Sequence, residues 1–322
     1  MHAIQVGRTG GPEVLEWTEV AGPEAGDGEL LVRLGAVGLN FIDTYHRTGL
    51  YPVDLPFVPG MEGAGTVEEV GQGVEGFEAG DRVAWADVLR SYAELARVPA
   101  GRAVRVPEGV GTDQAAAVML QGMTAHYLAH DTYPLQPGDP CLVHAGAGGV
   151  GHLLVQIAKR LGATVLVTVG SEEKAELARK AGADHAILYR DRDFGEAAEK
   201  AAGERRLAVV YDGVGKATFD RSLELLRPRG VMVAYGNASG PVEPVDPLRL
   251  SRGGSLYLTR PTLFNYISTR EDLEQRAGDL FSWIAAGELD VHIGERFPLA
   301  DAADAHRSLE GRRTTGKVLL EP

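Results

Sequence analysis

Hydrophobic and polar positions in the middle of the chain alternate in blocks that predict a parallel sheet covered by helices. Six short apolar runs are typical of strands, and amphipathic segments separate them. In the helix expected over Gly149–Leu161, Val150, Leu154 and Ile157 share one face. Continuous apolar strands indicate a sheet buried on both faces, so we expect a doubly wound α/β domain. The expected strands are Pro140–His144, Thr164–Val169, Ala186–Tyr189, Leu207–Tyr211, Val231–Tyr235 and Ser255–Thr259.

The first third of the chain has a different pattern, with shorter strands and tight glycine-containing turns. This pattern predicts a mostly antiparallel β region, with a helix from Thr112 to Met119. After residue 265 we expect a long amphipathic helix at Glu271–Ala286 and a terminal strand at Gly316–Leu320 that folds back onto the first region. The expected domains are therefore 1–122 and 266–322 together, with 123–265 inserted between them. The early strands are expected at Ala3–Val6, Glu29–Leu34, Gly65–Val70, Arg82–Trp85 and Tyr92–Val98.

Composition narrows the class of protein. The 322 residues are 44% hydrophobic, which supplies a sizeable core, and no apolar run approaches the roughly 18 residues that cross a bilayer. The N-terminal residues lack the apolar segment of a secretory signal, so we expect a cytoplasmic protein. The net charge of −13 and the lack of a basic stripe disfavour a nucleic-acid partner. The single cysteine, Cys141, excludes an intramolecular disulfide and a zinc site built from a cysteine cluster.

The strongest chemical signal is the glycine-rich segment Ala145–Gly151, which follows an expected strand and opens an expected helix. This context is the one that a dinucleotide-binding turn requires. Glycines there let the chain turn tightly and let backbone N–H groups approach a pyrophosphate, whose charge the helix N-terminus stabilises.

The end of the second expected strand indicates which nucleotide binds. Sites for NAD usually place an acidic residue there to bind the ribose hydroxyls, but this chain has Gly170. Ser171 and Lys174 follow and can contact a 2′-phosphate, so we expect NADPH rather than NADH. The alternative is that Lys174 is a solvated cation beside Glu172 and Glu173.

Several segments together resemble the medium-chain dehydrogenase/reductase superfamily, and within it the zeta-crystallin-like quinone oxidoreductases. The resemblance covers essentially the whole chain and implies an NADPH-binding Rossmann domain inserted in a mostly β, GroES-like catalytic domain. It also implies an NADPH-dependent enzyme that reduces small-molecule quinones. The segments that carry it are Val37–Asp43, Pro59–Gly65, Gly80–Val83, Ala145–Gly151, Tyr235–Gly240 and Thr259–Pro261.

Two residues separate this chain from the zinc alcohol dehydrogenases of the superfamily. Those enzymes carry a cysteine where this chain has Asn40 and a histidine where it has Met61. An amide and a thioether are poor zinc ligands, so we expect no metal. Without a Lewis acid an alcohol is difficult to oxidise, which favours an acceptor that takes hydride readily, such as a quinone or an enone.

The resemblance implies a set of cofactor-binding residues. Asn40 and, with less support, Lys317 are expected near the nicotinamide, while Tyr189 and Arg312 are expected to join Lys174 around the 2′-phosphate. Each has an alternative: Asn40 can bond adjacent backbone, Tyr189 can be a packing residue, Arg313 can replace Arg312, and Thr124 can cap a helix. The full expected set is Asn40, Thr124, Gly146, Gly148, Gly149, Val150, Gly170, Ser171, Lys174, Tyr189, Asn237, Arg312 and Lys317.

For catalysis we expect Asn40 and Tyr45, the second as a group that contacts the acceptor or donates a proton to it. Quinone anions can also take protons from water, so an essential acid is not required. Reduction of an enone or 2-alkenal is an alternative activity, and a non-enzymatic nucleotide sensor is another. The apolar strand at Ser255–Thr259 would otherwise be an exposed sheet edge, so we expect a homodimer joined there.

Overall fold

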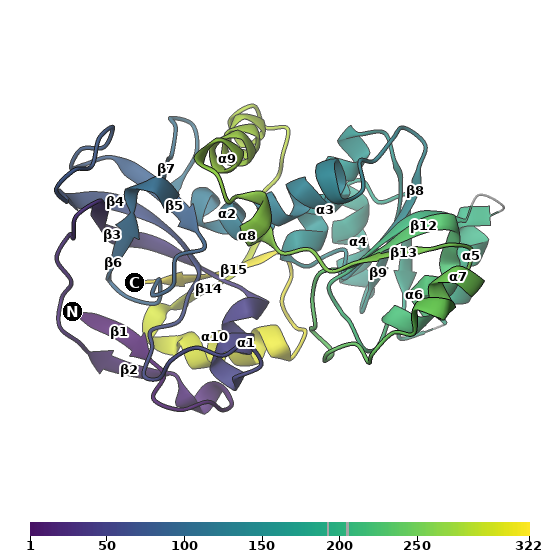
Figure 1. The fold of residues 1–322 in the computed structure, drawn as a ribbon, viewed down its shortest axis with the longest axis horizontal. Coiled ribbons are helices and arrows are strands. Elements are labelled where there is room, and N and C mark those ends of the chain that lie inside the picture. The colour runs from purple at the N-terminus through teal and green to yellow at the C-terminus, as the bar shows by residue number, and fades with distance from the viewer. Residues whose placement is uncertain (192, 204–205) are drawn as a thin grey trace. The chain divides into compact units, whose positions relative to one another are not determined.

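The computed structural model describes residues 1–191, 193–203 and 206–322. The chain divides into two compact units, one formed by Met1–Met123 with Tyr266–Pro322 and the other by Thr124–Asn265. Both termini belong to the first unit (Figure 1). The expected fold class, a doubly wound domain inserted in a mostly β domain, is confirmed. No helix in the described parts of the chain is both long and apolar enough to span a membrane.

The second unit contains a parallel six-stranded sheet with the order β10-β9-β8-β11-β12-β13. The chain runs outward from β8 in one direction and from β11 in the other, so the strand order reverses between these two strands. In open α/β sheets, ligands bind at the carboxyl ends of the strands beside such a reversal. The strands are β8 (Pro140–His144), β9 (Thr164–Val169), β10 (His185–Leu188), β11 (Leu207–Asp212), β12 (Leu226–Ala234) and β13 (Tyr257–Thr259).

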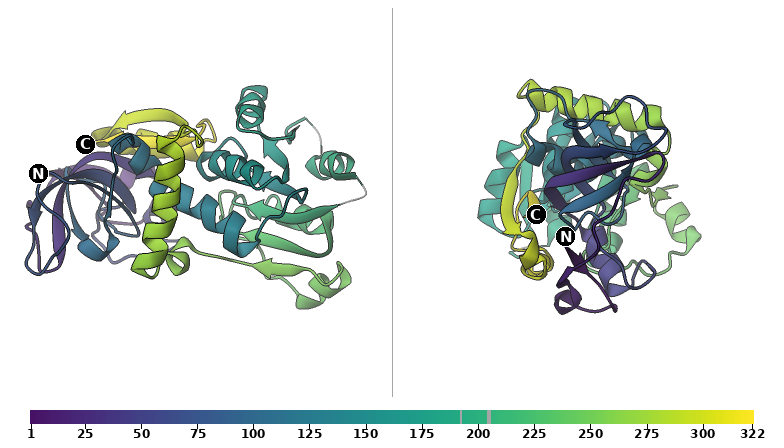
Figure 2. Two further views of the ribbon diagram at one scale, coloured as in Figure 1. Left: turned by 90° about the horizontal axis from the view of Figure 1, so that it is seen from above. Right: turned by 90° about the vertical axis from the view of Figure 1, so that its left-hand side faces the viewer.

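Helices lie on both faces of this sheet (Figure 2). Its core is made by fully buried side chains such as Leu142, Leu166, Val210 and Met232, as the apolar strands predicted. The last strand is shorter than expected because Ser255 has a left-handed φ of 57°, which a strand cannot accommodate. The helices are α3 (Gly149–Arg160), α4 (Glu172–Lys180), α5 (Phe194–Ala202), α6 (Phe219–Leu225) and α7 (Pro247–Arg252).

The first unit is built on a mostly antiparallel seven-stranded sheet with a separate β1-β2 pair. Trp85 and Tyr92 are fully buried in its core. The strands are β1 (His2–Gln5), β2 (Glu16–Glu19), β3 (Glu29–Leu39), β4 (Glu62–Val70), β5 (Arg82–Ala86), β6 (Leu95–Pro99), β7 (Val104–Arg105), β14 (Ile293–Pro298) and β15 (Lys317–Glu321).

Helices of the first unit depart most from the sequence predictions. Helix α2 continues to Tyr127 instead of ending at Met119, because its residues are apolar on all sides and Gly122 lets Leu280 of α9 approach closely. Two helices that carry candidate residues or their partners, α1 and α10, were not predicted. The helices are α1 (Phe41–Thr48), α2 (Thr112–Tyr127), α9 (Arg270–Ala285) and α10 (Ala302–Glu310), while α8 (Leu263–Tyr266) spans the boundary at which the second unit ends.

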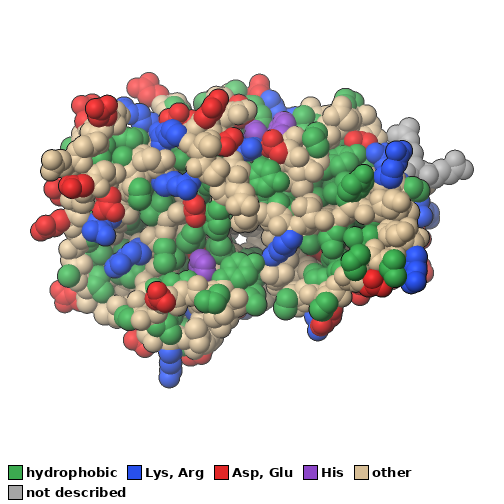
Figure 3. All heavy atoms as spheres, in the orientation of Figure 1, with side chains coloured by type: hydrophobic (Ala, Val, Ile, Leu, Met, Phe, Trp, Pro, Cys, Tyr) green, Lys and Arg blue, Asp and Glu red, His purple; other side chains and the backbone are tan. Residues whose placement is uncertain are grey.

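Charged side chains on the face shown in Figure 3 are mixed. Lys and Arg lie singly or in small groups among Asp and Glu, without a continuous basic stripe on that face. This face therefore does not show the continuous basic surface that is typical of nucleic-acid binding.

The pairing of β3 with β15 joins distant parts of the chain. The two strands are antiparallel, with Val318 opposite Leu39 and Leu319 opposite Gly38. This register brings Lys317, the first residue of β15, next to Asn40, which follows β3. Gly38 has no side chain, and this leaves room for the buried side chains of Glu62 and Lys317. A Cβ at Gly38 would lie 2.2 Å from the Glu62 carboxylate and 2.7 Å from the Lys317 Nζ.

We therefore expect Gly38→Ala to destabilise the protein by about 3 kcal/mol, because the added carbon must displace two buried charged groups. Gly35→Ala in the same strand is the matched control. Its added carbon would have the Thr112 methyl as its nearest contact, at 3.1 Å, and would lie 3.8 Å from the Ala64 carbonyl oxygen, so it should cost about 1 kcal/mol or less. Denaturant unfolding measures both variants, and equal losses would contradict this account of Gly38.

Candidate active site

The glycine-rich turn lies at the carboxyl end of β8 and leads directly into α3. Ala145 adopts a left-handed φ of 53°, and the Gly148 N–H donates to the Ala145 carbonyl at 2.8 Å. Gly149 and Val150 are the first residues of α3, and no side chain caps this helix. Its first N–H groups are therefore available to an anion, as a pyrophosphate site needs.

Close packing explains two of the glycines in this turn. A Cβ at Gly146 would lie 2.5 Å from the Val167 Cβ of β9, and one at Gly151 would lie 2.3 Å from the Ala145 carbonyl oxygen. Any side chain at these positions would push the turn away from the sheet. The glycines thus let backbone rather than side chains form the surface at this edge.

The ends of β9 and β10 bring several expected residues together in the second unit. Ser171 caps α4, its Oγ accepting from the Lys174 N–H at 3.4 Å. A Cβ on Gly170 would lie 2.9 Å from the Tyr189 hydroxyl and 3.5 Å from the Arg190 Nε, so both side chains lie beside Gly170. This edge of the sheet therefore combines hydroxyl groups and cations with no acid at the strand end.

Arg190 is the residue at this edge that the sequence analysis missed. Arg190 is exposed and directly follows Tyr189. A cation just after the third expected strand is the feature of the sequence that could have drawn attention to it. One of the two glutamates beside Lys174 is engaged elsewhere, because the Glu172 carboxylate accepts from Arg179 at 2.6 Å. That pairing leaves less negative charge facing a phosphate here.

Asn237 follows β12, at the same edge of the parallel sheet. In the amide orientation that satisfies both ends, its nitrogen donates to the Gly236 carbonyl and its oxygen accepts from Arg260, each at 3.0 Å. Arg260 also donates to the Ala234 carbonyl at 2.6 Å. Asn237 is thus held in place by its own strand end and by the residue that follows β13.

Thr124, the first residue of the second unit, is buried in the interior of α2. The alternative that it caps a following helix is wrong, because α2 runs without interruption from Thr112 to Tyr127.

The first unit contains a buried polar cluster made of Asn40, Glu62, Gln121 and Lys317, which we call the Asn40 cluster. The Asn40 Oδ1 accepts from the Lys317 Nζ and from the Gln121 Nε2, both at 3.0 Å. The Asn40 Nδ2 donates to the Glu62 Oε2 at 2.9 Å. Lys317 also forms a short ion pair with Glu62, and the two side chains are 2% and 0% exposed.

Helix α2 contributes a backbone group to the same cluster. The Leu120 N–H donates to the second oxygen of Glu62 at 2.5 Å. Burial lowers the pKa of Lys317, while the Glu62 carboxylate opposes that shift. The carboxylate is therefore surrounded by donors and belongs to a structural ion pair.

This donor set does not fit a zinc ion. Asn40 and the buried Met61 stand at the two positions where the zinc alcohol dehydrogenases carry a cysteine and a histidine. The lysine ammonium faces the Glu62 carboxylate. In the part of the chain that the structure describes, no group of three or more His, Cys, Asp or Glu side chains is placed to hold a metal. An amide, a thioether and a cation are not a zinc coordination sphere.

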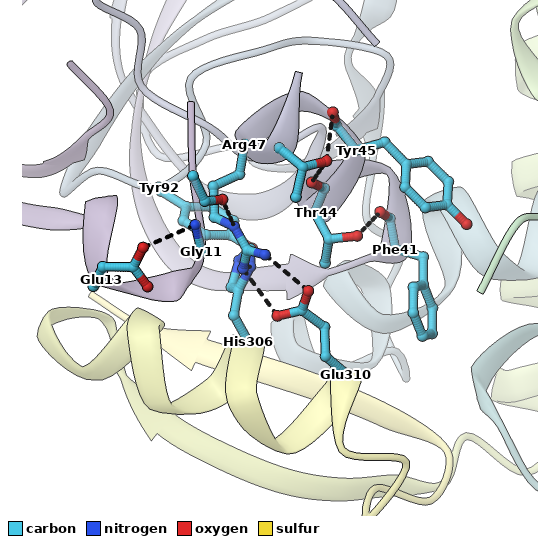
Figure 4. A network of polar contacts seen from close by, with 11 residues as sticks. Gly11, Glu13, Phe41, Thr44, Tyr45, Arg47, Tyr92, His306 and Glu310 are labelled. Carbon is cyan, nitrogen blue, oxygen red and sulfur yellow. Dashed lines mark hydrogen bonds and ion pairs between the residues drawn. The ribbon is translucent and has the colours of Figure 1, made fainter. Parts of the chain in front are cut away.

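Tyr45 lies in α1, and its ring contacts Phe41 and Tyr51, with centroids 6.4 and 5.2 Å apart. Figure 4 shows its phenol directed away from the Arg47–Glu310 ion pair. Arg312 lies in the first unit, in a left-handed turn just after α10, with a φ of 56°. The roles expected for Tyr45 and Arg312 stay predictions.

A second buried chain of polar groups connects α10 to α1 (Figure 4). Arg47 is 1% exposed, pairs with the Glu310 carboxylate at 2.8 Å and donates to the His306 Nδ1 at 3.0 Å. The His306 Nε2 lies 3.1 Å from the Tyr92 hydroxyl, which donates to the Asp43 Oδ2, also at 3.1 Å. Burial beside Arg47 lowers the pKa of His306 to about 3, so the ring is neutral.

Comparisons with known proteins agree with this architecture. Residues 149–283 match the family model described as zinc-binding dehydrogenase, and residues 26–140 match the alcohol dehydrogenase GroES-like domain. A quinone oxidoreductase of Pseudomonas aeruginosa is 48% identical, with 99% of each chain covered. A 2-haloacrylate reductase of a Burkholderia species is 43% identical, covering 99% of this chain and 98% of its own. The crystal structure of an Escherichia coli quinone oxidoreductase complexed with NADPH is similar, with a TM-score of 0.98, 44% identity and full coverage of both chains.

The Asp43 carboxyl should make stability depend on pH. Burial raises the pKa of Asp43 to about 7, although the Asn40 N–H, Tyr92 and Lys317 oppose the shift, and its Oδ1 receives no hydrogen bond from any described residue. Between pH 4 and pH 7 the folded state then holds a proton that the unfolded state lacks. Stability from this group is complete below its unfolded pKa and is lost as the pH rises through 7.

We expect Asp43→Asn to remove this dependence. Between pH 4.5 and 7, the free energy of unfolding of the unaltered protein should fall as the pH rises. This fall should be steeper than that of the variant by up to about 1.4 kcal/mol per pH unit. Denaturant titrations across this range measure both slopes. Asp304→Asn removes an exposed carboxyl group as the control, and a slope unchanged by Asp43→Asn would contradict the prediction.

Proposed function

The chain belongs to the quinone oxidoreductase family, and from this premise we propose that it transfers hydride from NADPH to quinones without a metal. The resemblance to that family found in the sequence is thereby confirmed. NADPH, a proton and a quinone would give NADP⁺ and a hydroquinone. When bound, NADPH would supply a hydride, which carries both electrons of its C–H bond, and the second hydrogen of the product would come from the proton.

The observation that carries the proposal is the edge of the second unit's sheet. An uncapped helix start follows the glycine-rich turn, Tyr189 and Arg190 lie beside Gly170, and Ser171 caps the helix that carries Lys174. Phosphate oxygens attract this combination of cations and hydroxyl groups. We infer that the pyrophosphate binds at α3 and the 2′-phosphate at the end of β9, with Arg312 as a further candidate contact.

The Asn40 cluster supports a quinone as the acceptor. Its cation is an ammonium that is already hydrogen bonded to Asn40 and Glu62, so it is not arranged to polarise a carbonyl as a Lewis acid does. A quinone needs little polarisation, because its reduction produces an aromatic ring. Positioning of cofactor and acceptor then supplies most of the rate enhancement, and the cofactor supplies the redox chemistry.

Cofactor preference tests the proposal. We expect the protein to oxidise NADPH in the presence of a benzoquinone, with NADH a much poorer donor. Lys174→Ala should raise KM for NADPH about 10- to 100-fold and leave KM for NADH nearly unchanged, because one contact to a charged phosphate is lost. Absorbance at 340 nm follows both reactions.

The matched control is Lys180→Ala at the far end of α4, where the lysine pairs with Glu176 on the surface. It should change neither constant. Equal use of NADH and NADPH by the unaltered protein, or an equal loss with both in Lys174→Ala, would refute the assigned 2′-phosphate site.

Reduction of an activated carbon–carbon double bond is the second candidate, favoured by the 43% identity to a 2-haloacrylate reductase. Protonation of carbon depends on a placed acid more than protonation of a quinone oxyanion does. Under this reading, Tyr45→Phe should lose about 100-fold in kcat/KM on an enone but less than about 3-fold on a benzoquinone. Tyr51→Phe, whose ring contacts that of Tyr45, is the control, and equal losses on both acceptors would exclude Tyr45 as the acid.

Two further features remain predictions. Strand β13 is the edge of its sheet, and its Tyr257 is 60% exposed, which supports a homodimer joined along this strand. A cytoplasmic location would give the enzyme access to NADPH.

A further inference from the structure

Asn40 has no hydrogen-bonding capacity left for a ligand. Its Oδ1 accepts from Lys317 and Gln121, and its Nδ2 donates to Glu62 and, at 3.1 Å, to the Gly38 carbonyl. A side-chain amide has two lone pairs and two N–H groups, and all four are used. Asn40 can therefore pack against a ligand but cannot bind its polar groups without losing a partner.

The polarity of the cluster is fixed from its charged end. The Lys317 ammonium can only donate, so the Asn40 oxygen must face it, and the Glu62 carboxylate can only accept, so the Asn40 nitrogen must face that group. Gln121 is bonded to the same Asn40 oxygen and must therefore present its own N–H there. Its carbonyl oxygen is turned the other way as a consequence.

That carbonyl oxygen is the open position of the cluster. The Gln121 Oε1 is buried, yet it receives no hydrogen bond from any residue that the structure describes. Buried polar atoms almost always have a partner, so such an atom calls for a donor from outside the chain. Gln121 as a whole is only partly buried, so the residue borders the surface.

We propose that Gln121, rather than Asn40, is the member of the cluster that binds the reacting ligands, its Oε1 accepting a hydrogen bond from an N–H or O–H group. The inference rests on the proposed function, which supplies two sources of such a donor. One is the carboxamide N–H of the nicotinamide, and the other is the hydroxyl of the reduced acceptor. Lys317, Glu62 and Asn40 fix the orientation of the Gln121 amide.

The test uses Gln121→Leu, which keeps the shape of the side chain and removes its acceptor, with the exposed Gln275→Leu of α9 as the control. Binding is measured by quenching of protein fluorescence without turnover. The probes are NADPH and its reduced 3-acetylpyridine analogue, in which a methyl group replaces the carboxamide nitrogen. The unaltered protein should bind NADPH about 5- to 10-fold more tightly than the analogue, and Gln121→Leu should abolish this difference.

A second arm covers the other donor. If the cofactor arm shows no change, inhibition by the hydroquinone product should weaken about 5- to 10-fold in Gln121→Leu, while inhibition by its dimethyl ether stays constant. A change in either arm supports the proposal and identifies the donor. No change in both arms, with NADPH still bound by the unaltered protein, overturns it.

Two outcomes separate this inference from the proposed function. If the unaltered protein does not bind NADPH, the proposed function and the inference are both refuted. If it binds NADPH but Gln121→Leu changes neither arm, only the inference is refuted. Gln121→Met, with a similar length and no strong acceptor, repeats the test if the leucine variant unfolds at a lower temperature than the control.

Discussion

The buried ion pair between Lys317 and Glu62 is the interaction on which the first unit depends. It joins the last strand of the chain to β4, and through Asn40 and the Leu120 N–H it reaches the start of α1 and the middle of α2. Removing one partner of such a pair leaves an unpaired buried charge, which typically costs about 3–5 kcal/mol. Because the two residues are separated by the whole inserted unit, the first unit is complete only when the C-terminal strand has paired with β3.

Charges at one end of a buried chain orient the neutral groups along it. In the first chain Lys317 and Glu62 orient Asn40, and Asn40 orients Gln121. In the second, Arg47 donates to the His306 Nδ1, so the neutral ring presents its Nε2–H to Tyr92, and Tyr92 presents its hydroxyl to Asp43. The two chains meet at the start of α1, where the Asn40 N–H and the Tyr92 hydroxyl both donate to the Asp43 Oδ2.

The sequence was most informative where structure is local. Apolar strands separated by amphipathic helices predicted the doubly wound sheet, and the glycine-rich segment lies between a strand and a helix, as expected. Helix α1 escaped notice, although the Asp43 side chain accepts from the Asn40 N–H at its start, because eight residues carry little periodic signal. Lys317 was named as a candidate, but its contact with Asn40 depends on the register of two strands far apart in the chain, which no local pattern specifies. Gln121 could not be singled out from the sequence, since its proposed role rests on a buried oxygen that receives no hydrogen bond from any described residue.

The same cluster supports the proposed metal-free activity, although the chain is related to zinc-binding dehydrogenases. A metal ion accepts electron pairs from a substrate oxygen, whereas an ammonium only donates hydrogen bonds, and here it is enclosed by Asn40 and Glu62. Its contacts are with the protein, where it fixes the orientation of two amide groups. Chemistry of this kind places the driving force in the cofactor and the acceptor, which suits the proposed quinone, and leaves to the protein the task of holding both in a reactive orientation.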